Sequence, residues 1–193
     1  MSSALTSAIA GLCSADSSVR SRAATEIYHT GRGPADLAVA AWWRDPELSR
    51  LLSRPVPAVT VGLAVEQETF AKIRAANGAP PLAKVPPDQD AEEFELHCPG
   101  GVSLDILTTM QPGGPGAIAR YLAKFGDGVQ QVEFRCLDVD RATQILKVKL
   151  GIAAVYPQTR PGADGTRVNF FLVPVPNAGK ILIELYEASD PNP

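Results

Sequence analysis

The run that determines the architecture is Val129-Gln130-Gln131-Val132-Glu133-Phe134-Arg135-Cys136. Apolar and polar residues alternate along most of it, and this period of two predicts a β-strand. A helical pattern follows at 140–150, and strand patterns follow at 152–156, 166–173 and 180–187. The sequence therefore predicts the order β-α-β-β-β for the segment from 127 to 188.

The same order is predicted for the segment before it. A strand pattern at 59–65 is followed by a helix from Gln67 to Asn77 and by strands at 82–85, 92–97 and 102–108. A joint rich in glycine and proline and a helix at 117–124 lead into the second copy. We expect an α+β domain over 56–188, with module 1 at about 56–111 and module 2 at about 127–188.

The spacing of apolar residues predicts that residues 1–54 form a small all-α segment. Leu5, Ala8, Ile9 and Leu12 have helical spacing, and a second helix begins near Asp16 or Ser17. We expect Gly31 and Gly33 to end that helix, close to a capping His29, and Pro34 to begin a third. Asp45-Pro46-Glu47 opens a fourth, and residues 54–57 form a stiff linker.

This segment is expected to pack against the main domain. Trp42 and Trp43 are the natural contact residues, either in that interface or in a dimer.

Composition limits the classes of function. Of 193 residues, 45% are hydrophobic and 20% charged, which is typical of a soluble globular protein. The net charge of -3 argues against nucleic-acid binding, and no apolar run is long enough for a membrane span. Cys13, Cys98 and Cys136 are far apart, so we expect buried thiols and a cytoplasmic protein.

Three stretches carry a family resemblance: Gly116–Val132, Arg160–Phe170 and Ile181–Leu185. They resemble the vicinal oxygen chelate superfamily (glyoxalase, bleomycin resistance and dioxygenase proteins), and most of all methylmalonyl-CoA epimerase. The resemblance covers about two thirds of the chain. It implies paired βαβββ modules in a curled mixed sheet, with a divalent metal that chelates substrate oxygens while a base moves a proton.

The family's metal ligands are His, Gln or Glu, His, and Glu. By resemblance these positions fall on Thr60, Asp105, Gln131 and Glu184, so both histidines are missing. Of that set, Asp105, Gln131 and Glu184 are the candidate metal ligands, and oxygen donors suit Mg or Mn better than Zn. We expect no cofactor or one divalent cation, with His97 as an alternative ligand.

Strand alternation extends this set. If Gln131 and Glu184 face a cavity, then Glu133, Arg135 and Tyr186 face it too. Since several carboxylates in one cavity cannot all ionise cheaply, one would keep its proton and serve as a general acid or base. Alternatively, Arg135 forms an ion pair with Glu133. The candidate catalytic residues are Glu184, Asp105, Glu133 and Asp88. Asp88 is included because, by resemblance, it falls on a carboxylate that is proposed as a base in the family. The candidate substrate-binding residues are Thr60, Gln131, Arg135, Arg167 and Tyr186.

Arg160 and Arg167 flank a loop that contains two glycines. They could bind an anionic substrate, with the loop between them acting as a mobile lid. The alternative is that Asp164-Gly165 is simply a hairpin turn between strands.

Two classes of function remain open. The first is an isomerase, epimerase or lyase that transfers a proton on a carboxylated or acyl substrate; the loss of both histidines argues against methylmalonyl-CoA epimerase activity itself. The second is a metal-free protein that binds or sequesters a small molecule, as antibiotic-resistance members of the superfamily do. A homodimer is expected by analogy, and docking of another protein on the helical segment is a third possibility.

Overall fold

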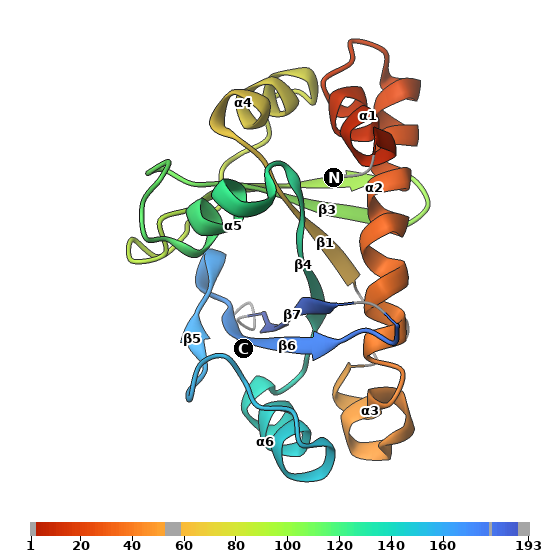
Figure 1. Ribbon diagram of the computed structural model, residues 1–193, viewed down its shortest axis with the longest axis vertical. Coiled ribbons are helices and arrows are strands. Elements are labelled where there is room, and N and C mark those ends of the chain that lie inside the picture. The colour runs from red at the N-terminus through yellow and green to blue at the C-terminus, as the bar shows by residue number, and fades with distance from the viewer. Residues whose placement is uncertain (1–2, 53–58, 178, 189–193) are drawn as a thin grey trace, which may run out of the picture. The chain divides into compact units, whose positions relative to one another are not determined.

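The computed structural model describes residues 3–52, 59–177 and 179–188. The chain forms two compact units (Figure 1). The first unit joins Met1–Gly31 to Thr60–Gln130, and the second joins Arg32–Val59 to Gln131–Pro193. The predicted linker at 54–57 lies outside the described residues, as does the predicted start of the main domain at residue 56.

The first unit contains a three-stranded sheet with β3 at its centre. Its strands are β1 (Val59–Ala64, which begins one residue before the unit), β2 (Glu92–Cys98) and β3 (Val102–Thr108). Its helices are α1 (Ser3–Leu12), most of α2 (Ser17–Ala38), α4 (Gln67–Ala76) and α5 (Ala117–Phe125). Strand β3 runs parallel to β1 and antiparallel to β2.

The strand predicted at 82–85 does not form. That segment is irregular and makes one backbone hydrogen bond toward β2, from Ala83 N to Glu93 O at 3.0 Å. Prolines flank it on both sides, and a proline has no N–H to donate to a sheet. The first module is therefore β1-α4-β2-β3, with an irregular edge where the extra strand was expected.

The second unit contains a four-stranded sheet with the order β4-β7-β6-β5. Its strands are β4 (Gly128–Arg135, which begins in the first unit), β5 (Arg160–Pro161), β6 (Arg167–Pro174) and β7 (Lys180–Glu187). Its helical elements are η1 (Trp42–Arg44), α3 (Pro46–Leu52), α6 (Val139–Leu150) and η2 (Ala163–Gly165). Strand β7 runs parallel to β4 and antiparallel to β6.

The strand predicted at 152–156 shrinks to one bridge, between Ala154 and Phe171. The short edge strand β5 forms a few residues later instead. The predicted order β-α-β-β-β is nevertheless confirmed for this module.

Helix α2 is longer than predicted, because Gly31, Gly33 and Pro34 do not end it. Gly31 is buried, and a Cβ atom there would lie 2.6 Å from Cγ1 of Val61, so glycine permits close packing on β1. A proline inside a helix costs about 3 kcal/mol. Ala35 and Val39 extend the buried face beyond it, both with 0% exposure, and their burial helps offset that cost. His29 is consequently an exposed residue in mid-helix rather than a cap.

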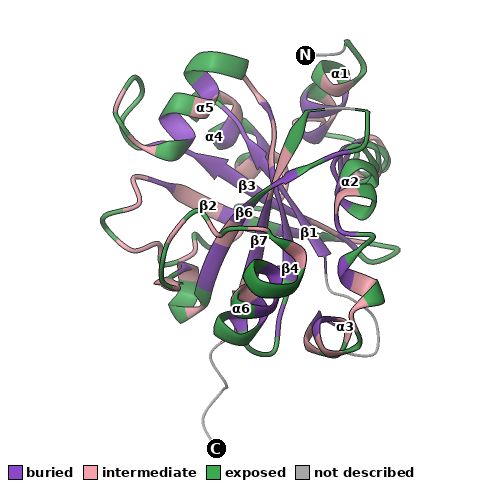
Figure 2. Cartoon of the chain, turned by 60° about the horizontal axis from the view of Figure 1, so that its bottom comes forward, coloured by how far each residue is buried: buried purple, intermediate pink, exposed green. Residues whose placement is uncertain are grey.

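The prediction that Trp42 and Trp43 are contact residues is confirmed for packing within the second unit. Trp42 is fully buried and meets the ring of Phe171 edge-on at 6.1 Å, and Trp43 lies 6.5 Å from Phe134. Helix α3 begins at Asp45-Pro46-Glu47 as predicted, and Asp45 caps it, since its Oδ1 accepts hydrogen bonds from the backbone N–H groups of Glu47 and Leu48. In Figure 2 the strands are largely buried, while α6 shows an exposed outer side.

Candidate functional site

The sheet of the second unit has two chemically different faces. Phe134, Phe171 and Leu185 belong to the back face, which Trp42, Trp43 and α6 cover. Directly paired residues on neighbouring strands share a face. Glu133 pairs with Glu184, and Glu184 pairs with Phe170, so these three lie together on the opposite face. We call this the site face.

Three polar side chains are linked on the site face. Gln131 Nε2 lies 2.7 Å from Glu184 Oε2 and 3.1 Å from Glu133 Oε1. Exposure is 6% for Gln131, 7% for Glu133 and 9% for Glu184. An amide nitrogen carries two hydrogens, so Gln131 can donate to both carboxylates at once. We call this group the amide–carboxylate cluster, and it brings together three of the residues predicted from the sequence.

This arrangement favours acid–base chemistry. Two buried carboxylates that share one neutral donor disfavour the state in which both are charged. A cluster that holds one proton between two carboxylates has both a proton donor and a proton acceptor close to one another.

With the nitrogen of the Gln131 amide turned toward both carboxylates, the cluster does not fit a divalent cation. An amide nitrogen is not a ligand for Mg or Mn, and here it occupies the position between the two carboxylates that a bridging cation would take. Within 3–52, 59–177 and 179–188, no group of three or more His, Cys, Asp or Glu side chains could hold a metal ion.

Thr60 and Asp105 belong to the first unit. Both are buried, with 6% exposure each, and Asp105 pairs with Gly62 on β1 and with Glu95 on β2. Their grouping with Glu184 in one cavity stays a prediction. His97 lies on the outer strand β2, as expected, where it is exposed and bonded to Glu95 at 2.9 Å and to Ser103 at 3.3 Å.

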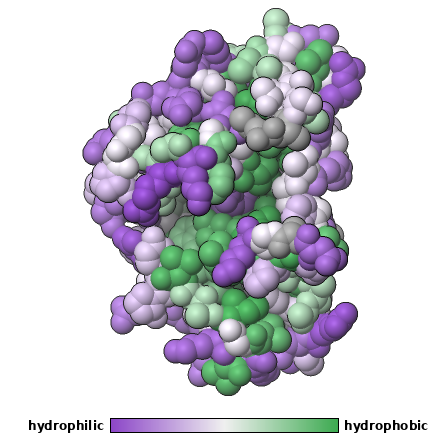
Figure 3. All heavy atoms as spheres, viewed as in Figure 1, coloured by the Kyte–Doolittle hydropathy of each residue, from purple (hydrophilic) through white to green (hydrophobic). Residues whose placement is uncertain are grey.

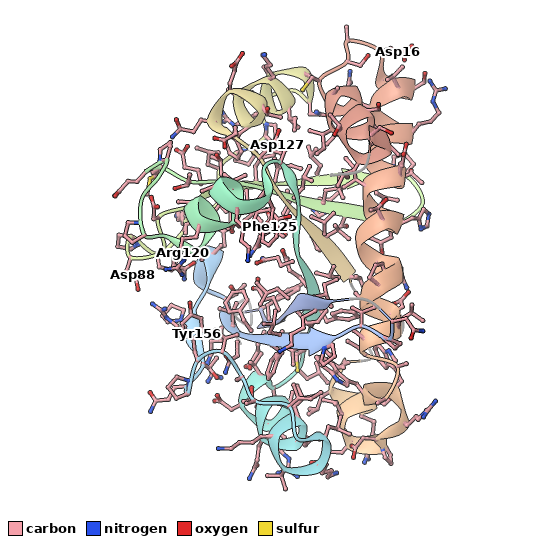
Figure 4. All side chains as sticks on the ribbon, in the orientation of Figure 1. Asp16, Asp88, Arg120, Phe125, Asp127 and Tyr156 are labelled. Atoms are coloured by element: carbon pink, nitrogen blue, oxygen red, sulfur yellow. The ribbon has the colours of Figure 1, made fainter. Side chains whose placement is uncertain are left out.

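The remaining predicted residues are more exposed than the cluster. Arg135 is exposed and pairs in register with the half-buried Tyr186 on the site face. Asp88 is exposed in a turn, at the periphery of Figure 4.

Arg167 is engaged by two carboxylates. Its guanidinium binds Asp140 of α6 and, at 3.4 Å, Glu187 of β7. The hydrogen bond to Asp140 is the main cause of the raised pKa of Arg167. An anionic substrate would have to compete with both carboxylates for this group.

Sequence reasoning missed a row of aromatic residues beside the cluster. The ring of Phe170 lies 5.9 Å from that of Tyr156, and the guanidinium of Arg160 lies 4.7 Å from the Tyr156 ring (Figure 4 labels Tyr156). The period of two along β6 could have placed Phe170 beside Glu184. No comparable signal existed for Tyr156, because its segment is irregular rather than the predicted strand.

The prediction of three buried thiols is confirmed for Cys136 alone among these cysteines. All three are unpaired, Cys136 is buried, and Cys13 and Cys98 are partly buried. Burial raises the pKa of Cys136 to about 11, so this thiol stays protonated at neutral pH and is a poor nucleophile.

Comparison with solved structures identifies the fold. Methylmalonyl-CoA epimerase from Mycobacterium tuberculosis matches with 28% identity and a TM-score of 0.54, over 67% of this chain and 86% of that chain. A methylmalonyl-CoA epimerase in complex with methylmalonyl-CoA and NH4+ matches with 25% identity and a TM-score of 0.53, over 68% of this chain and 93% of that one. A hypothetical protein, BH1468 from Bacillus halodurans C-125, matches with 19% identity and a TM-score of 0.56, over 69% and 95%.

No protein-family model matches the sequence, and no curated protein matches it. Among the described residues, none of the helices is long and apolar enough to cross a membrane. Hydrophilic side chains are frequent around the periphery of the face shown in Figure 3.

Proposed function

We propose that this protein, a member of the vicinal oxygen chelate superfamily that resembles methylmalonyl-CoA epimerase, is an enzyme that transfers a proton next to a carbonyl group. Its substrate would be a carboxylated or acyl compound, and its reaction that of an isomerase or epimerase, or of a lyase. The observation that carries the proposal is the amide–carboxylate cluster, in which Gln131 joins Glu133 to Glu184, the residue that the family resemblance aligns with the family's glutamate ligand.

Each residue of the cluster has a distinct role in this mechanism. The ionised carboxylate of Glu184 removes the proton from the substrate carbon, and the electron pair of that C–H bond moves to the carbonyl oxygen to give an enolate. Protonation of the same carbon on its opposite face by a second acid completes an epimerisation, and Glu184 then gives its proton to solvent. Gln131 fixes the orientation of Glu184 by its 2.7 Å hydrogen bond, and Glu133 holds the one proton that the pair of carboxylates shares before the reaction.

Asp105 and Asp88 are the lesser catalytic candidates. Thr60, Arg135 and Tyr186 are the proposed substrate-binding residues, together with Arg167 if an anion displaces its carboxylate partners. The mechanism takes no step through a metal, because the cluster does not fit one.

A metal-free binding protein is the alternative function. It is favoured by the same hydrogen bonds, since the neutral amide of Gln131 donates to both carboxylates. The cytoplasmic location and the homodimer stay predictions.

Hydrogen–deuterium exchange at the substrate carbon tests the enzyme directly. Purified protein in D2O is incubated with a panel of acyl-CoA thioesters and free 2-substituted dicarboxylic acids, and deuterium incorporation is followed by mass spectrometry. We expect catalysed exchange for at least one substrate, and a loss of about 10²–10⁴-fold in Glu184→Gln.

Glu68→Gln is the matched control, because it removes an exposed carboxylate on α4 of the first unit. Circular dichroism establishes that both variants fold. Exchange that survives in folded Glu184→Gln would overturn the assignment of Glu184. Binding of a ligand without any exchange in the wild type would favour the alternative function.

A further inference from the structure

Three polar side chains that the proposed function does not use meet on one face of the sheet in the first unit. Glu95 and His97 are two residues apart on β2, so both point to the same face, and His97 pairs in register with Ser103 on β3. Phe94 points to the opposite face, where a phenylalanine of α4 packs on it. Glu95 and His97 are exposed and Ser103 is half-buried, so a small molecule can reach all three.

The imidazole of His97 bridges the other two side chains. Its Nε2 lies 2.9 Å from Oε2 of Glu95, and its Nδ1 lies 3.3 Å from Oγ of Ser103. A carboxylate can only accept a hydrogen bond, so the neutral imidazole carries its proton on Nε2 and donates it to Glu95. Nδ1 then has a lone pair that can accept the hydroxyl proton of Ser103. The carboxylate thus selects the tautomer in which His97 can act as a base.

A hydroxyl, an imidazole and a carboxylate in this order are the parts of an activated nucleophile. The imidazole takes the hydroxyl proton, and the carboxylate orients the ring and stabilises the imidazolium that forms. The neighbouring turn leaves room for a substrate, because no described residue other than the chain neighbours lies within 4 Å of the Cβ position of Gly100 or Gly101.

Exposure sets the class of substrate. The side chains of His97 and Glu95 are 70% and 57% exposed, so water screens their attraction and the base is weaker than a buried one. A weakly activated serine needs an ester whose leaving group departs easily. An aryl ester of a small acid meets this requirement, since a phenolate is a good leaving group.

We propose that Ser103, His97 and Glu95 form a second reactive site, which hydrolyses small aryl esters through an acyl-serine. Oγ of Ser103 forms a bond to the carbonyl carbon while its proton passes to Nδ1 of His97. The C–O bond to the phenol then breaks, and the departing phenolate takes that proton. Water next attacks the acyl-serine, His97 moves a proton from the water to Oγ of Ser103, and the acid is released. Glu95 positions His97 and touches no reacting atom.

Diethyl p-nitrophenyl phosphate tests the nucleophile, because it leaves a stable phosphoryl group on a reactive serine. We expect mass spectrometry to find the diethylphosphoryl group on the peptide that contains Ser103, and we expect the labelling to be about tenfold slower in His97→Gln. His29→Gln is the matched control, because His29 is the other histidine of the chain and is also exposed. It should be labelled at the wild-type rate.

Turnover is tested with p-nitrophenyl acetate. We expect the wild-type protein to release more than one equivalent of p-nitrophenolate per chain, and we expect release to be about tenfold slower in Ser103→Ala. Because neither probe is a substrate for deuterium exchange, this site can be established or refuted whether or not the proposed function of Glu184 holds.

Free imidazole separates a base from a structural role. In folded His97→Ala, added imidazole should restore the labelling of Ser103, because it can occupy the space beside the hydroxyl. Glu95→Gln alone should slow the labelling. In His97→Ala with added imidazole, the further change Glu95→Gln should have no effect, because a free base does not need Glu95 for its orientation. Circular dichroism establishes that each variant folds.

Three results would overturn the proposal. The first is the absence of a phosphoryl group on Ser103, and the second is labelling of folded His97→Gln at the wild-type rate. The third is an equal loss of labelling in His29→Gln. Labelling of Ser103 without repeated release of p-nitrophenolate from the acetate would refute the hydrolysis, because the acyl-serine would then not be released.

Discussion

The two modules have the same strand plan but different side chains at matching positions. In each, the last strand lies beside the first in parallel, and the register pairs Gly62 with Asp105 in one module and Glu133 with Glu184 in the other. Asp105 therefore matches Glu184, and Thr60 matches Gln131. The first module has a glycine where the second has its additional carboxylate.

The edge strands differ as well. The residue opposite Asp105 is Glu95, which is exposed and paired with His97, whereas the residue opposite Glu184 is the aromatic Phe170. Among the residues that the structure describes, an acid pair, its amide bridge and an aromatic wall thus occur together in the second module and not in the first. On the proposed function, a repeated backbone carries the chemistry in one copy, while the other copy has the buried Asp105 at the matching position.

Restoring the family's histidines should have the largest effect. By the family resemblance, Thr60 and Gln131 stand where imidazoles bind the metal. We expect no measurable Co²⁺ binding by the wild-type protein. We expect the double variant Thr60→His/Gln131→His to bind about one equivalent of Co²⁺ per chain, because imidazole is a strong ligand for first-row metals. Titration calorimetry and the visible absorption of bound Co²⁺ measure this.

The single variants serve as controls for that experiment. Each adds an imidazole to only one module, and each is expected to bind Co²⁺ far more weakly than the double variant. A wild-type protein that already binds stoichiometric Mg²⁺ or Mn²⁺ would contradict the conclusion that the cluster does not fit a cation. A folded double variant that binds no Co²⁺ would contradict the assigned ligand positions.

The next largest effect is on stability and concerns the aromatic side chains that pack on each sheet. In the first unit, Phe70 of α4 packs edge-on against Phe94 at 4.8 Å. In the second unit the aromatic partner of Phe171 is Trp42, which comes from the helical N-terminal segment rather than from α6. The N-terminal segment thus completes a core that the second module does not fill by itself.

Trp42→Ala should accordingly destabilise the protein by about 3–5 kcal/mol in urea denaturation. Phe70→Ala should lower the free energy of unfolding somewhat less, because Phe70 is smaller and retains 6% exposure, whereas Trp42 has none. Within the part of the chain that the structure describes, the indole Nε1 of Trp42 has no hydrogen-bond partner. Trp42→Phe should therefore destabilise the protein less than Trp42→Ala, since it removes an unsatisfied hydrogen-bond donor and keeps an aromatic ring. A cost below about 1 kcal/mol for Trp42→Ala would refute this role.

Most elements could be predicted because their patterns are local. Alternation along 129–136 and helical spacing along 140–150 gave β4 and α6 to within a few residues. The errors arose where tertiary packing overrides local preference. Gly31 and Pro34 normally end a helix, but close packing on Val61 and burial of Ala35 and Val39 carry α2 past them.

The candidate site could also be predicted in part from the sequence. Alternation correctly put Glu133 on the same face as Gln131, and the family resemblance added Glu184. No local pattern separates the two arginines of the loop, because that separation depends on a β5–β6 register that the sequence did not suggest. The partners of Arg167 on α6 and β7 are equally invisible in a linear pattern.

The smallest predicted effect concerns the ion pairs that join α3 to α6 in the second unit. Arg141 binds Glu47, and Lys149 binds Asp45 at 2.9 Å and Glu47 at 3.4 Å. The pKa of Asp45 is lowered mainly by the backbone N–H of Leu48 and then by Lys149, and that of Glu47 mainly by Arg141. Because both pKa values lie below their ordinary 3.8 and 4.5, the stabilisation is complete above pH 4.5 and is lost as the pH falls through the lowered values.

Arg141→Gln/Lys149→Gln tests this while leaving the cap of α3 intact, since Asp45 still accepts from Glu47 and Leu48. Amide hydrogen exchange over Pro46–Leu52 should be modestly faster in the variant at pH 6, after correction for the intrinsic rate. The difference should shrink as the pH falls through the lowered pKa values, because the carboxylates then take up protons, and in 1 M NaCl, where a Debye length of about 3 Å screens exposed charges. A difference that persists under both conditions would show that α3 is held by packing of Leu48 and Leu52 rather than by charge.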